Sequence, residues 1–504
     1  MSTLQKNNMI NIISARGTRW TIEGLCIIAL SFLIGCAVGP DFVRPKPPTV
    51  DRYTSGAQPV ATITADGQAQ HFEQGAKISA DWWRLFNSSK LDAVIKEAIA
   101  NNPNLQAAQA SLRQSQEILR AGYGVFYPQL DAGFDATRQK FSQARFGGSS
   151  ASSIFNLYTL TTTVSYALDV FGGERRAVES LQARVDFQRY MVLGTYLTLS
   201  GNIVNTIIAQ AAYREQIKAT EQIISLLKEQ IRITEMQAQA GTVPYSNVLS
   251  IRSQLAATEA TLPPLKQRLS QTEHLLATLV GHLIAEWTPP QVDVADLTLP
   301  ADLPITLPSE LVHQRPDILA AEAQLHSASA EIGVATAALF PSFTLNGTYG
   351  LNNSSINDLF KNTSSFWNLG ANLTAPLFHG GILSARRRAA IEGYNQAAAN
   401  YRQTVLSAFA QVADNLRALE HDAETLRAQS QALKASEEAL RLIQANYEAG
   451  TVSYLQVLVA DNQYHQSKIG YLQALAQRFQ DTVALFVALG GGWRNAKERI
   501  PGNL

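Results

Sequence analysis

Two stretches of this sequence, NPNLQAAQASL at residues 102–112 and RPDILAAEAQL at residues 315–325, place proline, alanine and leucine in the same order. Three further landmarks recur at an offset of about 210 residues. They are FYP at 126–128 with LFP at 339–341, VFGG at 170–173 approximately with LFHGG at 377–381, and QAGTVPY at 239–245 with EAGTVSY at 448–454. Recurrence in one order predicts two copies of a single structural unit.

We place the first copy at residues 81–285 and the second at 309–493, with a short tail at 494–504. The intervening residues 286–308 contain five prolines, which break helices and indicate a connector that includes a short strand. Each copy predicts the same elements: one helix that starts before the landmark proline and ends near Tyr123 or Ala338, two strands, and two long helices joined at the Gly-Thr-Val landmark. The fold class is therefore α+β with an internal two-fold repeat.

The four strands show alternation of apolar and polar residues, and each is about as long as a tilted membrane strand. They lie near residues 129–135, 158–168, 342–351 and 367–374, and glycine-, serine- and asparagine-rich loops join them into two hairpins. Half-buried strands of a soluble sandwich are the alternative. Four strands do not close a barrel, and open edges are not tolerated in lipid. If the strands are in a membrane, several chains must therefore combine.

The long helices are predicted at residues 174–240 and 384–449, where no proline occurs. About 66 residues at 1.5 Å each give roughly 100 Å of helix, far more than a globular core needs. Apolar residues at three- and four-residue spacing indicate packing of helix against helix. A plain antiparallel coiled coil and the wall of a tunnel both fit this pattern.

The N-terminus combines basic residues, a short apolar run and the sequence LIGC ending at Cys36. The run is too short to span a bilayer and is typical of a secretory signal peptide at residues 1–35. LIGC resembles the lipobox of bacterial lipoproteins, which implies a lipid on Cys36; a buried free cysteine is the alternative. Residues 36–80 begin with a proline-rich stretch and are expected to form an extended tether. No later run of 18 apolar residues predicts a membrane-spanning helix.

Lys plus Arg and Asp plus Glu both number 41, so the formal net charge is zero and no nucleic-acid partner is expected. We find no sequence motif for nucleotide binding, zinc proteolysis or serine hydrolysis, and we expect neither an enzyme nor a metal site. Asp461 and His465 have helical spacing, but one such pair is weak evidence for a metal.

The sequence resembles the TolC-like outer membrane factors, in their lipoprotein (NodT-type) efflux branch. The resemblance covers almost the whole mature chain. It is carried by Cys36 with GPDFVRP at 39–45, WWRLF at 82–86, the strand entries and Gly-Thr-Val turns, and LGGGW at 489–493. It implies a homotrimer with a twelve-strand barrel and a periplasmic α-helical tunnel. It also implies small-molecule efflux with a periplasmic adaptor and an inner-membrane pump, and no cofactor beyond the lipid.

The resemblance assigns the helix-hairpin tips facing the adaptor to Gly241, Thr242, Val243, Gly450, Thr451 and Val452. A helix kink is the alternative to a turn at these glycines. Relatives line the closed end with aspartates after the second tip, where this chain has Gln456 and Val459. Asp461 is the nearest acid and would form a negative ring in a trimer; a solvated helix charge is its other interpretation.

Two basic clusters, Arg175–Arg176 and Arg386–Arg388, begin the long helix of each copy. We expect them at the inner edge of the outer membrane, where they would either bind lipid phosphates or form a solvated face. A different class of protein also fits part of the sequence: a lipid-anchored periplasmic coiled-coil adaptor without a pore. The alternating strands argue against it, because an adaptor needs no lipid-facing hairpins.

Overall fold

The computed structural model describes residues 37–56, 59–141 and 153–495. The predicted signal peptide and Cys36 therefore lie outside the described residues. The chain divides into two compact units. We call their described parts the strand unit (within residues 37–44, 114–185 and 323–399) and the helical unit (within residues 45–113, 186–322 and 400–495).

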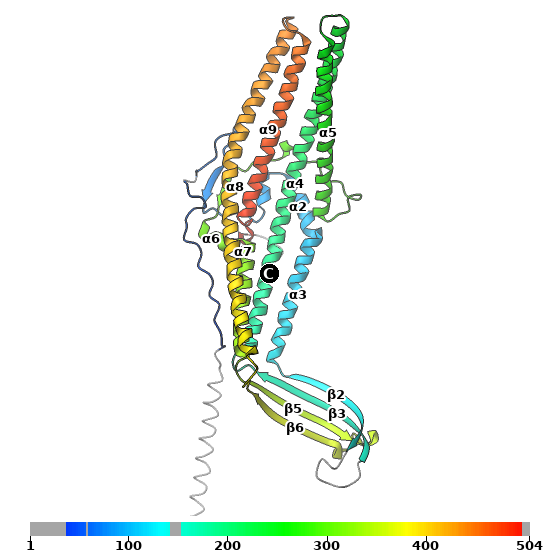
Figure 1. Ribbon diagram of the computed structural model, residues 1–504, viewed down its shortest axis with the longest axis vertical. Helices are drawn as coiled ribbons and strands as arrows, with labels where there is room; N and C mark the ends of the chain where they lie inside the picture. Colours follow the sequence, from blue (N-terminus) through cyan, green and yellow to red (C-terminus); the bar gives the residue numbers. More distant parts are fainter. Residues whose placement is uncertain (1–36, 57–58, 142–152, 496–504) are drawn as a thin grey trace, which may run out of the picture. The chain divides into compact units, whose positions relative to one another are not determined.

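The two halves of the chain contain the same elements in the same order (Figure 1). The first half consists of α2 (Ser89–Asn101), α3 (Pro103–Tyr123), β2 (Gln129–Phe141), β3 (Ser153–Leu168), α4 (Gly173–Gln239) and α5 (Tyr245–Val280). The second consists of α6 (Pro308–Gln314), α7 (Pro316–Ala337), β5 (Ser342–Asn353), β6 (Ser365–Thr374), α8 (Ile382–Glu448) and α9 (Tyr454–Ala488). The predicted internal repeat is thus present in the structure.

Each half begins with two helices where the sequence analysis expected one. The interruptions fall at Asn102 and Arg315, which adopt extended backbone conformations directly before Pro103 and Pro316. A residue before proline is disfavoured in the α region, whereas proline is well suited to the first turn of the next helix. The prediction of one continuous helix is therefore wrong, and the landmark proline itself is the reason.

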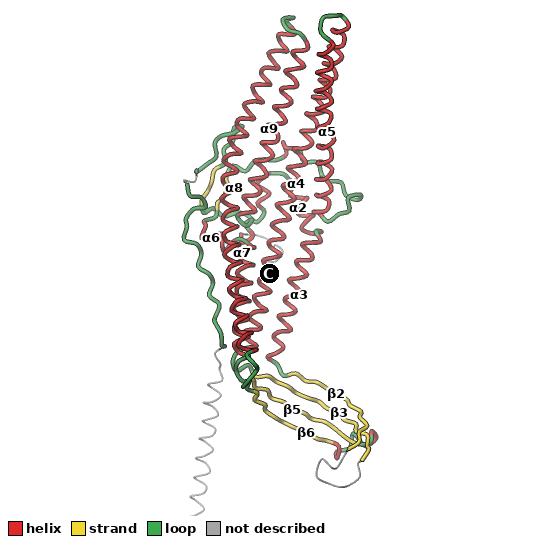
Figure 2. The backbone as a smooth tube through the Cα atoms, in the orientation of Figure 1, coloured by secondary structure: helices red, strands yellow, loops and turns green. Residues whose placement is uncertain are grey.

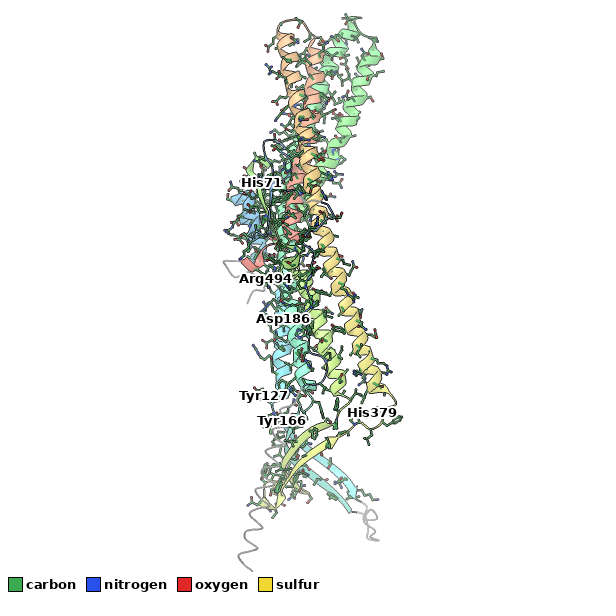
Figure 3. All side chains as sticks on the ribbon, turned by 90° about the vertical axis from the view of Figure 1, so that its left-hand side faces the viewer. His71, Tyr127, Tyr166, Asp186, His379 and Arg494 are labelled. Atoms are coloured by element: carbon green, nitrogen blue, oxygen red, sulfur yellow. The ribbon has the colours of Figure 1, made fainter. Side chains whose placement is uncertain are left out.

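All four strands of the strand unit form one antiparallel sheet in the order β2-β3-β5-β6 (Figures 1 and 2). The two predicted hairpins are joined by pairing of β3 with β5, in which Tyr166 lies opposite Leu345. β2 and β6 are the edge strands and have no further partner within the sheet. Tyr127 and Tyr166 lie at the same end of this sheet (Figure 3).

The helical unit has an aromatic core around the 3-10 helix η1 (Trp82–Phe86). Trp82 is fully buried and stacks on Phe486 of α9, with ring centroids 5.4 Å apart. Beside this core the connector supplies β4 (Asp302–Ile305), which pairs in parallel with β1 (His71–Gln74). The short strand expected in the proline-rich connector is therefore present.

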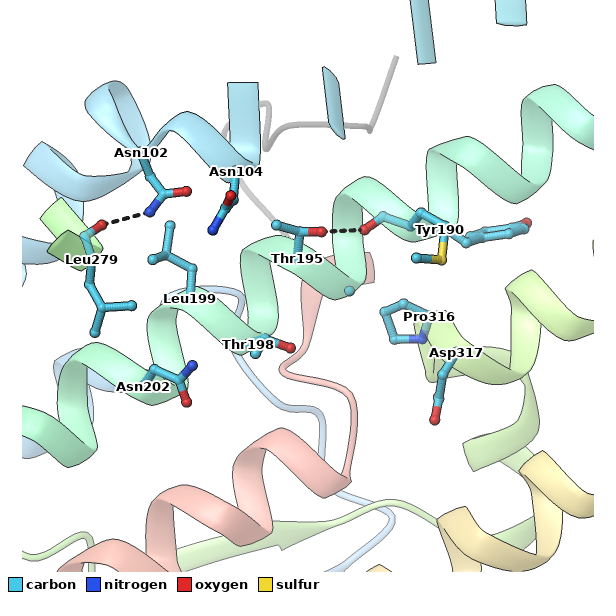
Figure 4. A pocket seen from close by; sticks show the side chains of 12 residues that line it. Asn102, Asn104, Tyr190, Thr195, Thr198, Leu199, Asn202, Leu279, Pro316 and Asp317 are labelled. Carbon is cyan, nitrogen blue, oxygen red and sulfur yellow. Dashed lines mark hydrogen bonds between the residues drawn. The ribbon is translucent and has the colours of Figure 1, made fainter. Parts of the chain in front are cut away.

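Asn102 and Arg315, the residues before the two landmark prolines, also make equivalent contacts in the helical unit. The Asn102 amide donates to the carbonyl of Leu279 at the end of α5, at 2.8 Å (Figure 4). The Arg315 guanidinium donates to the carbonyl of Ala488 at the end of α9, at 2.7 Å. In each half, the start of one helix is thereby tied to the end of the last helix.

One helix of the described residues, α4, is long and apolar enough to cross a membrane by composition. It contains an 18-residue window of mean hydropathy 1.3, of which 67% is buried within the protein. The sequence analysis missed this window because no unbroken apolar run marks it. Burial of this extent is typical of a core helix, so we attribute the apolarity of α4 to packing.

Candidate functional site

The first predicted tip is a helix-ending turn at Gly241. Gly241 has a φ of +71°, and the amide of Thr242 donates to the carbonyl of Gln237 at 2.9 Å. The Thr242 hydroxyl reaches the same carbonyl at 2.8 Å. This Schellman-type ending needs a left-handed residue, which glycine adopts without a steric penalty.

The second tip repeats this geometry. Gly450 has a φ of +74°, and both the amide and the hydroxyl of Thr451 donate to the carbonyl of Asn446 at 2.9 Å. In both turns the glycine and the threonine are exposed, whereas Val243 and Val452 are half-buried. The new helices begin within four residues of the glycines, so the alternative of a helix kink is wrong.

Charged side chains connect the two helices of the first hairpin. Three ion pairs join α4 to α5, with nitrogen–oxygen distances between 2.6 and 3.0 Å: Lys228–Glu259, Arg252–Glu235 and Lys266–Glu221. Exposed pairs of this kind each contribute little stability. Their repeated spacing nevertheless specifies the alignment of the two helices.

The second hairpin has a cleft of about 460 Å³ between α8 and α9. Two of the predicted gate residues, Gln456 and Val459, line it, and Val459 is 55% exposed. The remaining lining is mostly apolar and comprises Ser436, Ala439, Ile443, Leu455, Ala460 and Gln463. The structure therefore brings Gln456 and Val459 together on one surface of the hairpin.

Asp461 does not line this cleft. Its carboxylate lies 3.4 Å from Nε2 of His465, one helical turn along α9. Burial raises the pKa of Asp461 and lowers that of His465, while the neighbouring group opposes each shift. Among the described residues no group of three metal-ligating side chains occurs, so the Asp461–His465 pair has no third ligand beside it.

The two basic clusters differ in their surroundings. Arg176 is buried and forms ion pairs with Asp41 at 2.6 Å and Glu179 at 2.7 Å. Arg175 pairs with Asp169 at 3.1 Å. The prediction of a lipid-binding or solvated face is therefore wrong for Arg176, because the N-terminal segment supplies a carboxylate for it. Arg386–Arg388, in contrast, are exposed.

The N-terminal segment is extended as predicted, and it is bound along its length. In the strand unit, the Val38 amide donates to the Phe171 carbonyl at 3.0 Å, and Phe42 stacks on His326 with centroids 4.3 Å apart. In the helical unit, the Tyr53 hydroxyl donates to the Thr306 carbonyl at 2.7 Å. Val38 and Phe42 lie within six residues of Cys36 in the chain.

A buried polar cluster in the helical unit was missed by the sequence analysis. Arg478 of α9 is fully buried, and its guanidinium donates to Gln70 at 3.0 Å and to Thr62 at 3.2 Å. Burial lowers the pKa of Arg478, and the nearby Asp422 carboxyl opposes this shift. The spacing of residues in the sequence could not reveal this cluster, because Gln70 and Thr62 are more than 400 residues away from Arg478 in the chain.

Asp422 of α8 belongs to the same cluster. Burial raises the pKa of its carboxyl to about 8, the neighbouring Asp481 carboxyl adds to the rise, and Arg478 opposes it. An unfolded aspartate has a pKa near 4, so the folded chain retains this proton between about pH 4 and pH 8. The stabilisation of the folded chain by this proton is fully present below about pH 4. It is lost as the pH rises toward about 8.

We therefore expect the melting temperature to fall by a few degrees between pH 5 and pH 8, and the substitution Asp422→Asn to remove much of this fall. Asparagine resembles the protonated carboxyl but does not titrate. The matched control is Asp414→Asn, at an exposed carboxyl of the same helix. Thermal scans in detergent at several pH values test this, and an unchanged pH slope in the Asp422 variant contradicts the assignment.

Together these features define a class of protein. An antiparallel sheet of four strands with two unpaired edges is connected to helices of 67 residues, which end in exposed glycine turns. Four strands alone are too few to close a barrel. This is the construction of a membrane channel protein.

The comparisons with known proteins identify the family. The model of the outer membrane efflux protein family matches residues 94–282 and 307–491, and the chain belongs to this family. It is 31% identical, over 93% of this chain and 97% of the relative, to the pyoverdine export outer membrane protein OpmQ of Pseudomonas putida. It is 26% identical, over 92% and 97%, to the cation efflux system protein CusC of Escherichia coli.

The solved structure of the outer-membrane channel OprN matches with a TM-score of 0.79 and 27% identity, over 91% of this chain and all of that one. The protein is thus an outer-membrane efflux channel component, as the sequence resemblance implied. The alternative of a periplasmic adaptor without a pore is wrong, because the outer-membrane channel OprN matches 91% of this chain.

Proposed function

We propose that three copies of this chain form a passive conduit for small molecules, with a twelve-strand barrel in the outer membrane and a helical tunnel in the periplasm. The observation that carries the proposal is the four-stranded sheet with unpaired edges at β2 and β6. Four strands are too few to close, and unsatisfied edges are costly in lipid. Trp367 and Leu369 of β6 are 72% and 78% exposed, as lipid-facing residues would be.

We further propose that a lipid on Cys36 anchors the chain and that no other cofactor is needed. The bound segment after Cys36 supports this, since it would hold the lipid next to the sheet. The cargo we propose is drugs or other toxic small molecules. OpmQ is named for pyoverdine export and CusC for cation efflux, so chains of similar sequence serve different cargoes.

We assign the contact with a periplasmic adaptor to the two tips. The adaptor links the channel to an inner-membrane pump. Both turns are exposed and structurally equivalent, as a surface that meets a repeated partner would be. In this assignment Gln456 and Val459 border the entrance, and Asp461 supplies the negative charge near it.

The assembly is tested by the native mass of the detergent-solubilised protein and its migration before and after heating. We expect the mass of three chains and a heat-modifiable band. A monomer that remains in solution without detergent would contradict the proposal.

The adaptor contact is tested by the substitutions Val243→Asp and Val452→Asp, introduced together. A charge at each tip should abolish most of the drug resistance that the parent gene restores to a deletion strain, with an unchanged amount of trimer in the membrane. The matched control is Leu85→Asp, at an exposed apolar position outside both hairpins. Full resistance in the tip variant would contradict the assignment.

A further inference from the structure

The buried polar cluster of the helical unit leaves one nitrogen of a charged side chain without a partner. Arg478 is fully buried, and its Nε and Nη2 atoms donate to the side-chain oxygens of Gln70 and Thr62 at 3.0 and 3.2 Å. Both of these oxygens are neutral. The third nitrogen, Nη1, has no hydrogen-bond partner among the described residues. A buried charge is costly unless hydrogen bonds and an opposite charge satisfy it.

The carboxyl that acts electrostatically on Arg478 is that of Asp422. Burial and the neighbouring Asp481 raise the pKa of Asp422 to about 8, so at neutral pH this carboxyl holds its proton and is uncharged. Asp481 itself accepts a hydrogen bond from the Gln477 amide at 2.9 Å. Protonated Asp422 does not neutralise the guanidinium, so Arg478 remains a buried positive charge.

Arg478 also lines a cavity of about 240 Å³ in the helical unit. A turn of the N-terminal segment, the connector, α8 and α9 enclose it. One water molecule takes about 30 Å³ in the liquid, so the cavity has room for several groups of that size. Asp66, Gln68 and Thr298 line it as well and are exposed, so the cavity opens to solvent. A solute can therefore enter from outside and approach the buried end.

The carboxylate of Asp66 lies at the exposed end of the cavity. It accepts hydrogen bonds from the hydroxyls of Tyr471 and Ser430, so part of its hydrogen-bonding capacity is already used. Water screens a charge at the surface, whereas a buried charge such as that of Arg478 is screened less. Asp66 therefore weakens the attraction of the cavity for an anion but does not cancel it.

We propose that this cavity binds a small monoanion, a halide or the carboxylate of a small acid, through Nη1 of Arg478. Nη1 carries two N–H donors. Because Nε and Nη2 are already engaged, the guanidinium does not offer the free parallel pair of donors that holds a larger oxyanion. A compact anion that accepts from one nitrogen suits this donor set. Arg478 connects the N-terminal segment to α9, so a bound anion should stabilise the helical unit.

Anion binding is tested by thermal unfolding of the full-length protein in detergent at pH 7 and constant sodium concentration. Chloride or acetate replaces gluconate, which is a bulkier anion. We expect the melting temperature to rise with the logarithm of the concentration of the anion that binds, because a ligand specific for the folded state stabilises it in this way. A stronger response to chloride identifies a halide site, and a stronger response to acetate identifies a carboxylate site.

Two substitutions should weaken the response. Arg478→Gln keeps an amide donor for Gln70 but has no charge, and it should abolish the rise. Thr298→Trp places a large ring at the exposed end of the cavity, so at least about tenfold more anion should be needed for the same rise. Thr288→Trp is the matched control, because Thr288 is exposed in the same connector and does not line the cavity. It should respond as the parent does.

Asp66→Asn should strengthen the response, because it removes the negative charge at the exposed end. The same rise should then need severalfold less anion. Asparagine also tolerates the left-handed backbone of Asp66, whose φ is +53°. An unchanged requirement for anion in this variant would contradict the placement of the anion in this cavity.

Equal responses of the parent, Arg478→Gln and Thr298→Trp would show a general salt effect and overturn the site. No response of the parent to either anion would mean that water alone occupies the cavity, which overturns it as well. If Arg478→Gln does not fold, the two tryptophan variants still separate binding in the cavity from a salt effect. None of these outcomes depends on the mass of the assembly, so the anion site and the proposed channel are tested separately.

Discussion

Replacing Trp82 with alanine is expected to lower the free energy of unfolding by about 3–5 kcal/mol, the largest effect of any single substitution we propose. The indole is fully buried and packs against Phe486, Trp83 and Phe86. Its removal leaves a cavity where η1 meets α9, and the surrounding rings are too rigid to fill it. Loss of apolar burial and of aromatic contacts therefore adds to the cost of the cavity.

Leu85→Ala is the matched control, because Leu85 lies in the same 3-10 helix and is 43% exposed. It should change the free energy of unfolding by no more than about 0.5 kcal/mol. Denaturant unfolding of the detergent-solubilised protein, followed by circular dichroism, compares the two. A loss in the Trp82 variant as small as that in the Leu85 variant would mean that the buried indole contributes little to the core of the helical unit.

The second large effect concerns the residues before the landmark prolines. Arg315 is buried, and it donates to Ala488, Gln411 and both carboxylate oxygens of Asp317 at 2.7–3.0 Å. Hydrogen bonds from a charged group are stronger than neutral ones, so Arg315→Ala should cost about 3 kcal/mol. Lysine lacks the planar, forked set of donors of a guanidinium. Arg315→Lys should therefore retain only a small part of the stability that Arg315→Ala loses.

Asn102→Ala is the equivalent substitution in the first repeat. Asn102 caps α3 by accepting the Leu105 amide at 2.9 Å and also donates to Leu279. We expect a smaller loss of about 1–2 kcal/mol, because these bonds are neutral. Arg268→Ala, at an exposed arginine of α5, serves as the control for both. A larger loss at Asn102 than at Arg315 would contradict the account of these contacts.

The parts of the fold that depend on local chemistry were predictable from the sequence. The turns at Gly241 and Gly450 were expected because glycine ends helices in a left-handed conformation, and both glycines have it. Alternating apolar residues marked all four strands. The helix breaks at Asn102 and Arg315 are also local in origin, because proline disfavours the helical conformation in the residue before it.

Long-range pairing was not predictable, because periodicity does not identify partners. The β3–β5 pairing joins strands from different repeats, and alternation alone fits separate hairpins equally well. Arg176 belonged to a basic cluster in the sequence, yet its partner Asp41 lies 135 residues away. Arg478 likewise donates to Gln70 and Thr62, which lie near the start of the described chain. Such contacts emerge only when distant segments pack together.

The most direct test of the efflux function is the susceptibility of a deletion strain to a broad panel of antibiotics, detergents, dyes and metal salts, measured against the same strain carrying the gene. We predict increased susceptibility to at least one class of compound, fully reversed by the gene and not by the double tip variant. Equal susceptibility and equal accumulation of every compound in both strains would contradict an efflux channel for toxic small molecules.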